Sequence, residues 1–186
     1  MPSAISPSDG SDRRVWQVRP ARPADASTVA AIYNEGIRAR VATFETRERK
    51  ATDIESWFDP PPGPITYPPH PFLVAERDGV VDGWVHASVY RPREAYRRIA
   101  EYSIYTTDAA RGCSLGDALM TAFLPACERA GIAKLVARIF PENSASLSLC
   151  ARHGFRVVGT YEKHGMLDGV WRDVVIVERL FPENQR

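Results

Sequence analysis

The chain has 186 residues, of which 44% are hydrophobic and 25% are charged, and its formal net charge is +1. This length is enough for one domain with a buried core. The near-neutral charge excludes the strongly basic surface that is typical of nucleic-acid-binding proteins. No stretch approaches the roughly 20 apolar residues of a membrane span, so we expect no membrane insertion.

The three cysteines (Cys113, Cys127 and Cys150) lack paired spacing, so they indicate neither a disulfide framework nor a zinc site. The four histidines are scattered along the chain, which argues against a metal centre. We therefore expect a protein of the reducing cytoplasm that needs no metal.

Residues 1–14 (MPSAISPSDGSDRR) are rich in Ser, Pro and Asp and contain no apolar core of a signal peptide. This composition predicts a disordered leader. Residues 15–186 then form the single predicted domain.

The first half of that domain predicts one strand and two helices. Residues 15–20 alternate apolar and polar side chains, as a half-buried strand does. Residues 23–40 place apolar side chains at helical spacing, with Asp25 or its neighbours as candidate caps. A short helix over 52–58 has Thr52 as its candidate cap, and the Pro-rich residues 59–71 predict a long loop.

The second half predicts more strands. Residues 72–90 form two strands around an Asp78-Gly79 turn, which is a strong hairpin signal. A strand over 97–107 leads to a helix that begins near Gly116 and ends at Gly131. Pro125 inside that helix is expected to kink it or to cost about 3 kcal/mol. The remaining segments predict a strand, a helix and a closing hairpin, over 133–140, 144–154, 155–165 and 170–181. The order β-α-α-β-β-β-α-β-α-β-β favours an α/β fold in which helices cover a mixed sheet.

Residues 108–116 (DAARGCSLG) connect a strand to a helix. Such a connection brings several backbone N–H groups and the positive end of a helix to one place, and this arrangement binds phosphate oxygens. Neither the P-loop pattern nor the three glycines of a dinucleotide-binding loop are present. Taken alone, the loop favours a plain turn that contains two glycines.

The pattern Arg-x-x-Gly-x-Gly/Ala at the start of a central helix resembles the coenzyme A pyrophosphate loop of GNAT-type N-acetyltransferases. Arg111 and Gly116 match this pattern, whereas Ser114 stands at a glycine position. Serine lacks the freedom of glycine at positive φ, although its hydroxyl can donate to a phosphate. Residues 141–155 (PENSASLSLCARHGF) resemble the next conserved segment of the family, in which Asn143 binds the pantetheine arm.

This resemblance implies the GNAT fold, a central mixed, mostly antiparallel, twisted sheet flanked by helices. It also implies acetyl-CoA as the cosubstrate. The implied cofactor-binding residues are Ile104, Tyr105, Thr106, Arg111, Gly112, Cys113, Ser114, Leu115, Gly116, Asp117 and Asn143.

Residues 19–181 further resemble the phosphinothricin acetyltransferase branch of this family. Members acetylate the free α-amino group of small amino-acid analogues that carry a phosphinate, sulfoximine or arsinate group, and so detoxify them. The resemblance implies a small amino-acid-like substrate, an antibiotic-resistance role and a homodimer.

The same resemblance implies roles for individual residues. Glu101 aligns with the family's general base, which would assist an α-amino group whose pKa lies near ~8. The alternative is a solvated carboxylate on a strand. Backbone N–H groups of residues 104–106 would stabilise the oxyanion of the reaction. The implied substrate-binding residues are Thr43, Phe44, Arg93 and Tyr96, whereas His86 either contacts the substrate or only packs.

One departure concerns the leaving group. Many family members place a Tyr where this chain has Cys150, and that Tyr protonates the departing thiolate. Two other functions stay open. One is acetylation of a protein N-terminus or another amine, and the other is CoA binding without catalysis.

Overall fold

The computed structural model describes residues 16–186, so the predicted leader over 1–14 lies outside the described residues. The elements follow the predicted order. The strands are β1 (Gln17–Pro20), β2 (Phe72–Arg77), β3 (Val80–Val89), β4 (Ile99–Thr106), β5 (Lys134–Ile139), β6 (Arg156–Leu167) and β7 (Val170–Leu180). The helices are α1 (Ala26–Ala39), α2 (Ala51–Glu55), α3 (Leu115–Arg129) and α4 (Ser144–Arg152).

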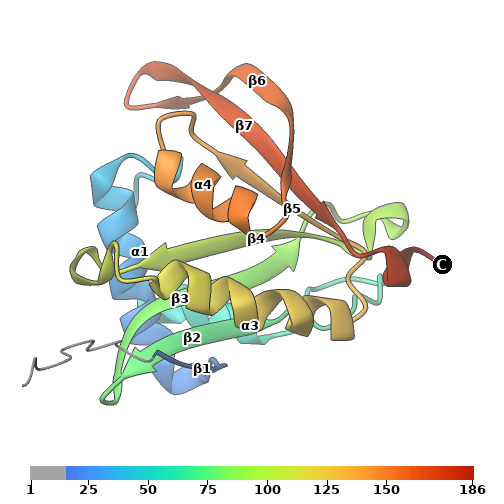
Figure 1. Ribbon diagram of the computed structural model, residues 1–186, viewed down its shortest axis with the longest axis horizontal. Helices are drawn as coiled ribbons and strands as arrows, with labels where there is room; N and C mark the ends of the chain where they lie inside the picture. The colour runs from blue at the N-terminus through green and yellow to red at the C-terminus, as the bar shows by residue number, and fades with distance from the viewer. Residues whose placement is uncertain (1–15) are drawn as a thin grey trace, which may run out of the picture.

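The strands form one seven-stranded sheet in the order β1-β2-β3-β4-β5-β7-β6. All neighbouring pairs are antiparallel except β4 and β5, which are parallel. Helices α3 and α4 lie in front of this sheet in Figure 1, and α1 lies behind it. The predicted mixed, mostly antiparallel sheet flanked by helices is confirmed.

Two apolar clusters hold the helices to the two faces of the sheet. Leu115, Leu119 and Phe123 of α3 are almost fully buried against the front face of the sheet. On the opposite face, Val29 and Ile32 of α1 pack around Trp84 of β3. Burial of side chains this large stabilises the fold by about 1.5–3 kcal/mol for each.

Two local predictions need correction. Thr52 does not cap α2, because the helix begins at Ala51 and the Asp53 carboxylate accepts the Lys50 N–H at 2.8 Å instead. Asp25 precedes α1 at the N-cap position, but its carboxylate accepts the backbone N–H of Arg22 and pairs with Arg19. Pro125 lies inside α3, as the sequence predicts, and the helix continues to Arg129.

Candidate active site

The parallel strands β4 and β5 separate halfway along their length. Their pairing covers only Ile99–Glu101 against Lys134–Val136, after which β4 continues to Thr106 and β5 to Ile139. A cavity of about 60 Å³ lies between the separated strands, and we call it the β4–β5 gap. Beyond Glu101, β4 therefore has no strand partner on its β5 side within the described sheet. The predicted backbone donors at 104–106 belong to this unpaired stretch.

The start of α3 presents a cluster of unpaired backbone donors. Among the described residues, the N–H groups of Leu115, Gly116 and Asp117 have no backbone acceptor, and Ala118 is the first to donate, to the Ser114 carbonyl. Gly112 has a φ of 74°, and a side chain added there would meet open space. Ser114 has a φ of 59°, and its hydroxyl makes no capping bond to the helix. The loop therefore adopts an anion-binding geometry despite the serine.

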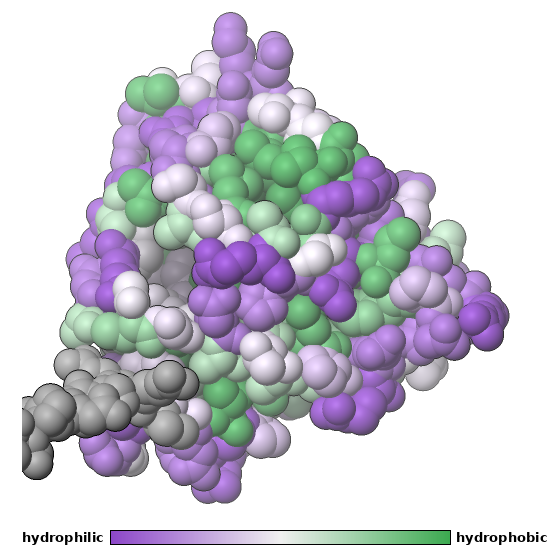
Figure 2. Space-filling model, viewed as in Figure 1, coloured by the Kyte–Doolittle hydropathy of each residue, from purple (hydrophilic) through white to green (hydrophobic). Residues whose placement is uncertain are grey.

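These donors face a cavity of about 570 Å³ between α3 and α4, which we call the α3–α4 groove. Figure 2 shows a hollow left of centre, between the positions of α4 and the N-terminal end of α3. Every predicted cofactor-binding residue lines this groove except Cys113. The Cys113 carbonyl instead accepts a hydrogen bond from Trp16 Nε1 at 3.1 Å.

The charges beside the groove favour an anion. The carboxylate of Asp117 accepts two hydrogen bonds from Arg152, at 2.9 and 3.1 Å, and this contact lowers the pKa of Asp117. Arg152 thereby offsets the Asp117 carboxylate beside the free N–H groups. Gly116 also has a packing role, since a Cβ there would lie 3.1 Å from the Leu149 side chain. It allows α3 and α4 to pack closely.

Asn143 lies at the junction of the groove and the gap, and its predicted binding of the pantetheine arm stays a prediction. Its Oδ1 accepts the Ser146 N–H at 3.1 Å, which caps α4. Its Nδ2 lies 3.4 Å from the Val41 carbonyl. A single side chain thus joins the start of α4 to the segment that follows α1.

A second large cavity lies on the α1 face of the sheet and has a volume of about 550 Å³. We call it the α1 pocket. Its lining includes Thr43 and Phe44, as predicted, together with Glu101. Ala42 and Tyr105 border the α1 pocket, the gap and the groove, so the gap joins the two large cavities. A molecule in the groove can therefore meet a molecule in the α1 pocket at β4.

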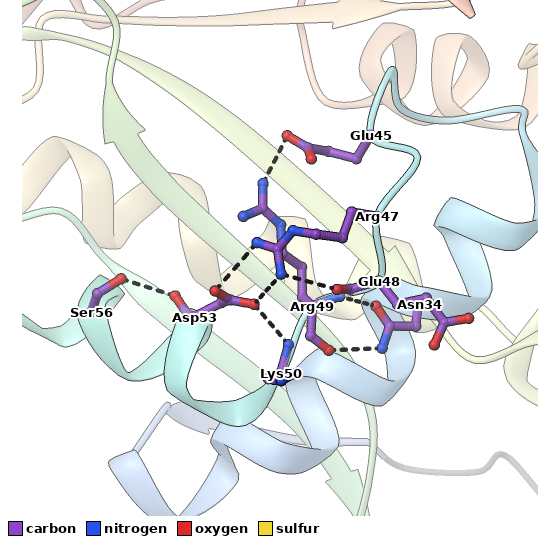
Figure 3. Close-up of polar contacts among 8 residues, drawn as sticks. All are labelled: Asn34, Glu45, Arg47, Glu48, Arg49, Lys50, Asp53 and Ser56. Atoms are coloured by element: carbon purple, nitrogen blue, oxygen red, sulfur yellow. Dashed lines mark hydrogen bonds and ion pairs between the residues drawn. The ribbon is translucent and has the colours of Figure 1, made fainter. Parts of the chain in front are cut away.

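The segment that carries Thr43 and Phe44 is fixed by polar contacts (Figure 3). The Asn34 side chain accepts the Arg49 N–H at 2.7 Å and donates to the Arg49 carbonyl at 2.9 Å. Arg49 also forms an ion pair with Glu45 at 2.7 Å. Phe44 packs edge-on against Phe140 at 4.8 Å, and the absent side chain of Gly165 leaves room for its ring. Helix α1 therefore positions one wall of the pocket.

Glu101 sits on the pocket wall with 19% of its side chain exposed. Its two oxygens accept hydrogen bonds from Arg138, at 2.7 Å from Nε and 2.6 Å from Nη2. Glu101 is therefore a pocket residue and not a freely solvated carboxylate. Arg138 was not predicted as a site residue, although its charge in the apolar segment AKLVARIF was a signal for it.

Several other residues lie away from the cavities. The structure does not bring Arg93 and Tyr96 to the α1 pocket, because Arg93 is exposed on the β3–β4 connection and Tyr96 packs against Tyr90. Their predicted role in substrate binding stays a prediction. His86 packs, as it stacks on Trp57 at 5.1 Å, and burial lowers its pKa to about 3.

Cys150 is buried, with 2% of its surface exposed, and it lines none of the three cavities. Its sulfur lies 2.9 Å from the Tyr102 hydroxyl. Burial raises the pKa of the thiol. The position that holds a proton donor in many family members is thus buried and lies outside the lining of the three cavities.

The sheet is open between β4 and β5, and the start of α3 presents free N–H donors beside this gap. This geometry agrees with the family that the sequence comparison identifies. Residues 30–155 match the acetyltransferase (GNAT) family, and the chain belongs to this family. It is an acetyl-CoA-dependent N-acetyltransferase.

Three individual proteins show in more detail what this chain is similar to. The chain is 34% identical over 163 residues to a phosphinothricin N-acetyltransferase of Alcaligenes faecalis, a match that covers 87% of this chain and 81% of that protein. The structure superposes with a TM-score of 0.79 on a phosphinothricin acetyltransferase of Sinorhizobium meliloti in complex with acetyl-CoA, at 30% identity over 89% of this chain and 88% of that one. It is also similar to a ribosomal-protein-alanine N-acetyltransferase of Brucella melitensis, with a TM-score of 0.80 and 27% identity over 89% and 99% of the two chains.

None of the helices over 16–186 has both the length and the apolar run needed to cross a bilayer. The same residues hold no cluster of three or more His, Cys, Asp or Glu side chains arranged for a metal ion.

Proposed function

We propose that this protein transfers an acetyl group from acetyl-CoA to the α-amino group of a small amino-acid analogue of the phosphinothricin, methionine sulfoximine or arsinothricin type. Such a reaction detoxifies the analogue and gives resistance to it. The observation that carries the proposal is the position of Glu101, on the wall of a 550 Å³ pocket that meets the α3–α4 groove at the β4–β5 gap. The likeness to phosphinothricin N-acetyltransferase supports the substrate class.

In this reaction the phosphates of acetyl-CoA lie against the free N–H groups at the start of α3. The thioester reaches through the β4–β5 gap toward Glu101. The amine nitrogen forms a bond to the thioester carbon while the C–S bond breaks, and Glu101 accepts the amine proton directly or through water. Unpaired N–H groups of β4 stabilise the oxyanion. The thiolate of CoA takes its proton from solvent, because Cys150 is buried away from the gap.

A second candidate is acetylation of a protein N-terminus, which the likeness to a ribosomal-protein-alanine N-acetyltransferase favours. Both candidates share the same chemistry at Glu101. They differ in what is attached to the carbon that carries the amine, since an amino acid has a free carboxylate there and a peptide has an amide.

The test is release of CoA thiol with a panel of amines. The panel contains phosphinothricin, methionine sulfoximine, arsinothricin, glutamate and a peptide with a free N-terminus. We expect turnover with at least one of the three analogues and little with the peptide. Faster turnover of the peptide would favour the second candidate, and no turnover of any amine would indicate CoA binding without catalysis.

We also propose a homodimer. Large apolar side chains are exposed on the β6–β7 hairpin, including Val157, Val170 and Trp171 at 55–61% exposure. Apolar surface also gathers in the upper part of Figure 2, over this hairpin. A second copy would remove such a patch from water. Light scattering on the purified protein checks the expected mass of two chains.

A further inference from the structure

The ion pair between Glu101 and Arg138 joins the proposed base to a cation on the neighbouring strand. The last paired residues of β4 and β5 are Glu101 and Val136, so Arg138 lies two residues into the stretch where the strands separate. Both side chains line the α1 pocket. Half of the Arg138 side chain is exposed, compared with 19% for Glu101. The arginine is therefore open to a ligand from the pocket side.

Only one edge of the Arg138 guanidinium is used by Glu101. Nε and Nη2 donate to the carboxylate, which occupies two of the five N–H donors of the group. Nη1 makes no hydrogen bond to any residue over 16–186. The edge formed by Nη1 and Nη2 thus keeps parallel donors for a second carboxylate, which is the anion that fits this fork.

We infer that this free edge of Arg138 binds the α-carboxylate of the substrate while its other edge positions Glu101. This inference rests on the proposed function and specifies how the pocket recognises an amino acid. In an α-amino acid, the amine and the carboxylate are attached to the same carbon. A carboxylate held by Arg138 therefore brings the amine next to the Glu101 oxygens, each of which still has a lone pair to accept a proton.

The charges alternate in this arrangement. The substrate carboxylate faces the arginine, and the substrate ammonium faces the glutamate. A peptide N-terminus or a polyamine has no carboxylate at that position, so the free edge of Arg138 would remain unpaired. Arg138 is accordingly a substrate-binding and positioning residue that selects free α-amino acids over other amines.

The experiment compares L-methionine sulfoximine with its α-carboxamide, two amines that differ only in the group Arg138 is inferred to bind. CoA-thiol release gives kcat and KM for the wild type, Arg138→Gln and Arg138→Lys. Arg97→Gln is the matched control. Arg97 has 51% of its side chain exposed and pairs with Glu94 at 2.7 Å, and Arg138 has nearly the same exposure and pairing distance. Acetyl-CoA binding and thermal unfolding of each variant report whether it is folded.

We expect the wild type to prefer the acid over the carboxamide by about 10- to 100-fold in kcat/KM, as a charge-assisted pair provides. Arg138→Gln should raise KM for the acid and bring this preference close to one, and should lower kcat for both amines because Glu101 loses its partner. Arg138→Lys should restore part of the preference, and Arg97→Gln should leave it unchanged. A folded Arg138→Gln that keeps the wild-type preference would overturn the inference.

The outcomes separate the inference from the proposed function. If the wild type acetylates both amines equally well, the role of Arg138 in recognition is wrong and the amino-acid N-acetyltransferase remains. If the wild type acetylates neither amine, nor the other analogues, the proposed function fails and the inference fails with it.

Discussion

The Tyr102 hydroxyl and the Cys150 sulfur lie 2.9 Å apart in the core between β4 and α4. Both residues are at least 95% buried. This contact occupies the thiol that stands where many family members carry a proton-donating tyrosine. We therefore expect Cys150 to have a structural role.

Substitution Cys150→Ala should therefore leave kcat within about threefold of the wild type. It should lower the free energy of unfolding by about 1–3 kcal/mol, because the buried Tyr102 hydroxyl loses its partner. Steady-state kinetics and thermal or denaturant unfolding measure the two effects. A drop in kcat by orders of magnitude with an intact fold would instead identify Cys150 as the acid.

Substitution Glu101→Gln should lower kcat by about 10²–10⁴-fold, which is the usual contribution of a general base. The affinity for acetyl-CoA should change little, since Glu101 faces the α1 pocket and does not line the α3–α4 groove. Steady-state kinetics and titration with acetyl-CoA separate the two quantities. An unchanged kcat near pH 7 would mean that the amine arrives deprotonated and that Glu101 is structural.

Ser114 adopts a φ of 59°, a conformation that costs a residue with a side chain roughly 1–2 kcal/mol. Ser114→Gly should relieve this cost, raise the melting temperature and leave acetyl-CoA binding as tight or tighter. Ser114→Val should have the opposite effect, because a β-branched side chain tolerates this conformation least. Thermal unfolding with and without acetyl-CoA tests both variants. Weaker binding by Ser114→Gly would show that the hydroxyl itself holds a phosphate.

His86, which is partly buried, should make the fold sensitive to acid. Its pKa is about 3 in the folded protein because of burial, against 6.5 when exposed, so the unfolded chain binds more protons between these values. The stability is therefore complete above about pH 6.5 and falls as the pH drops toward 3, with a slope of up to about 1.4 kcal/mol per pH unit from this one group.

His86→Phe should flatten this dependence, since an aromatic ring can keep the stacking on Trp57 without binding a proton. Denaturant unfolding between about pH 4 and pH 7, where the two states differ in bound protons, compares the two proteins. Equal slopes would contradict the role of His86.

Sequence patterns were sufficient to predict the order of the helices and strands and most residues that line the α3–α4 groove. Apolar periodicity locates α1, α3 and the strands, and the loop from Arg111 to Gly116 resembles a family motif closely enough to predict its place. Most residues of the groove come from two segments, 104–117 and 143–152, and each segment contains a motif that resembles the family. Local sequence therefore carried most of the information about it.

The α1 pocket was harder to predict because its residues meet across the sheet. Arg138 is 37 positions from Glu101, and the two meet only because β5 pairs beside β4. Asn34 binds the backbone of Arg49 through a side chain that fits the helical pattern of α1 and gives no separate signal. The family resemblance also implied a substrate-binding role for Arg93, and the structure places this residue exposed on the β3–β4 connection, where it does not line the α1 pocket.

The central claim is that the α1 pocket takes a small amino-acid analogue. The most direct measurement is kcat/KM for phosphinothricin beside kcat/KM for a short peptide that begins with alanine, at the same acetyl-CoA concentration, with the N-acetylated product identified by mass spectrometry. We expect acetylation of the phosphinothricin α-amine with kcat/KM at least about tenfold above that of the peptide, which is the difference that one charge-assisted pair supplies. Preferential acetylation of the peptide would contradict it.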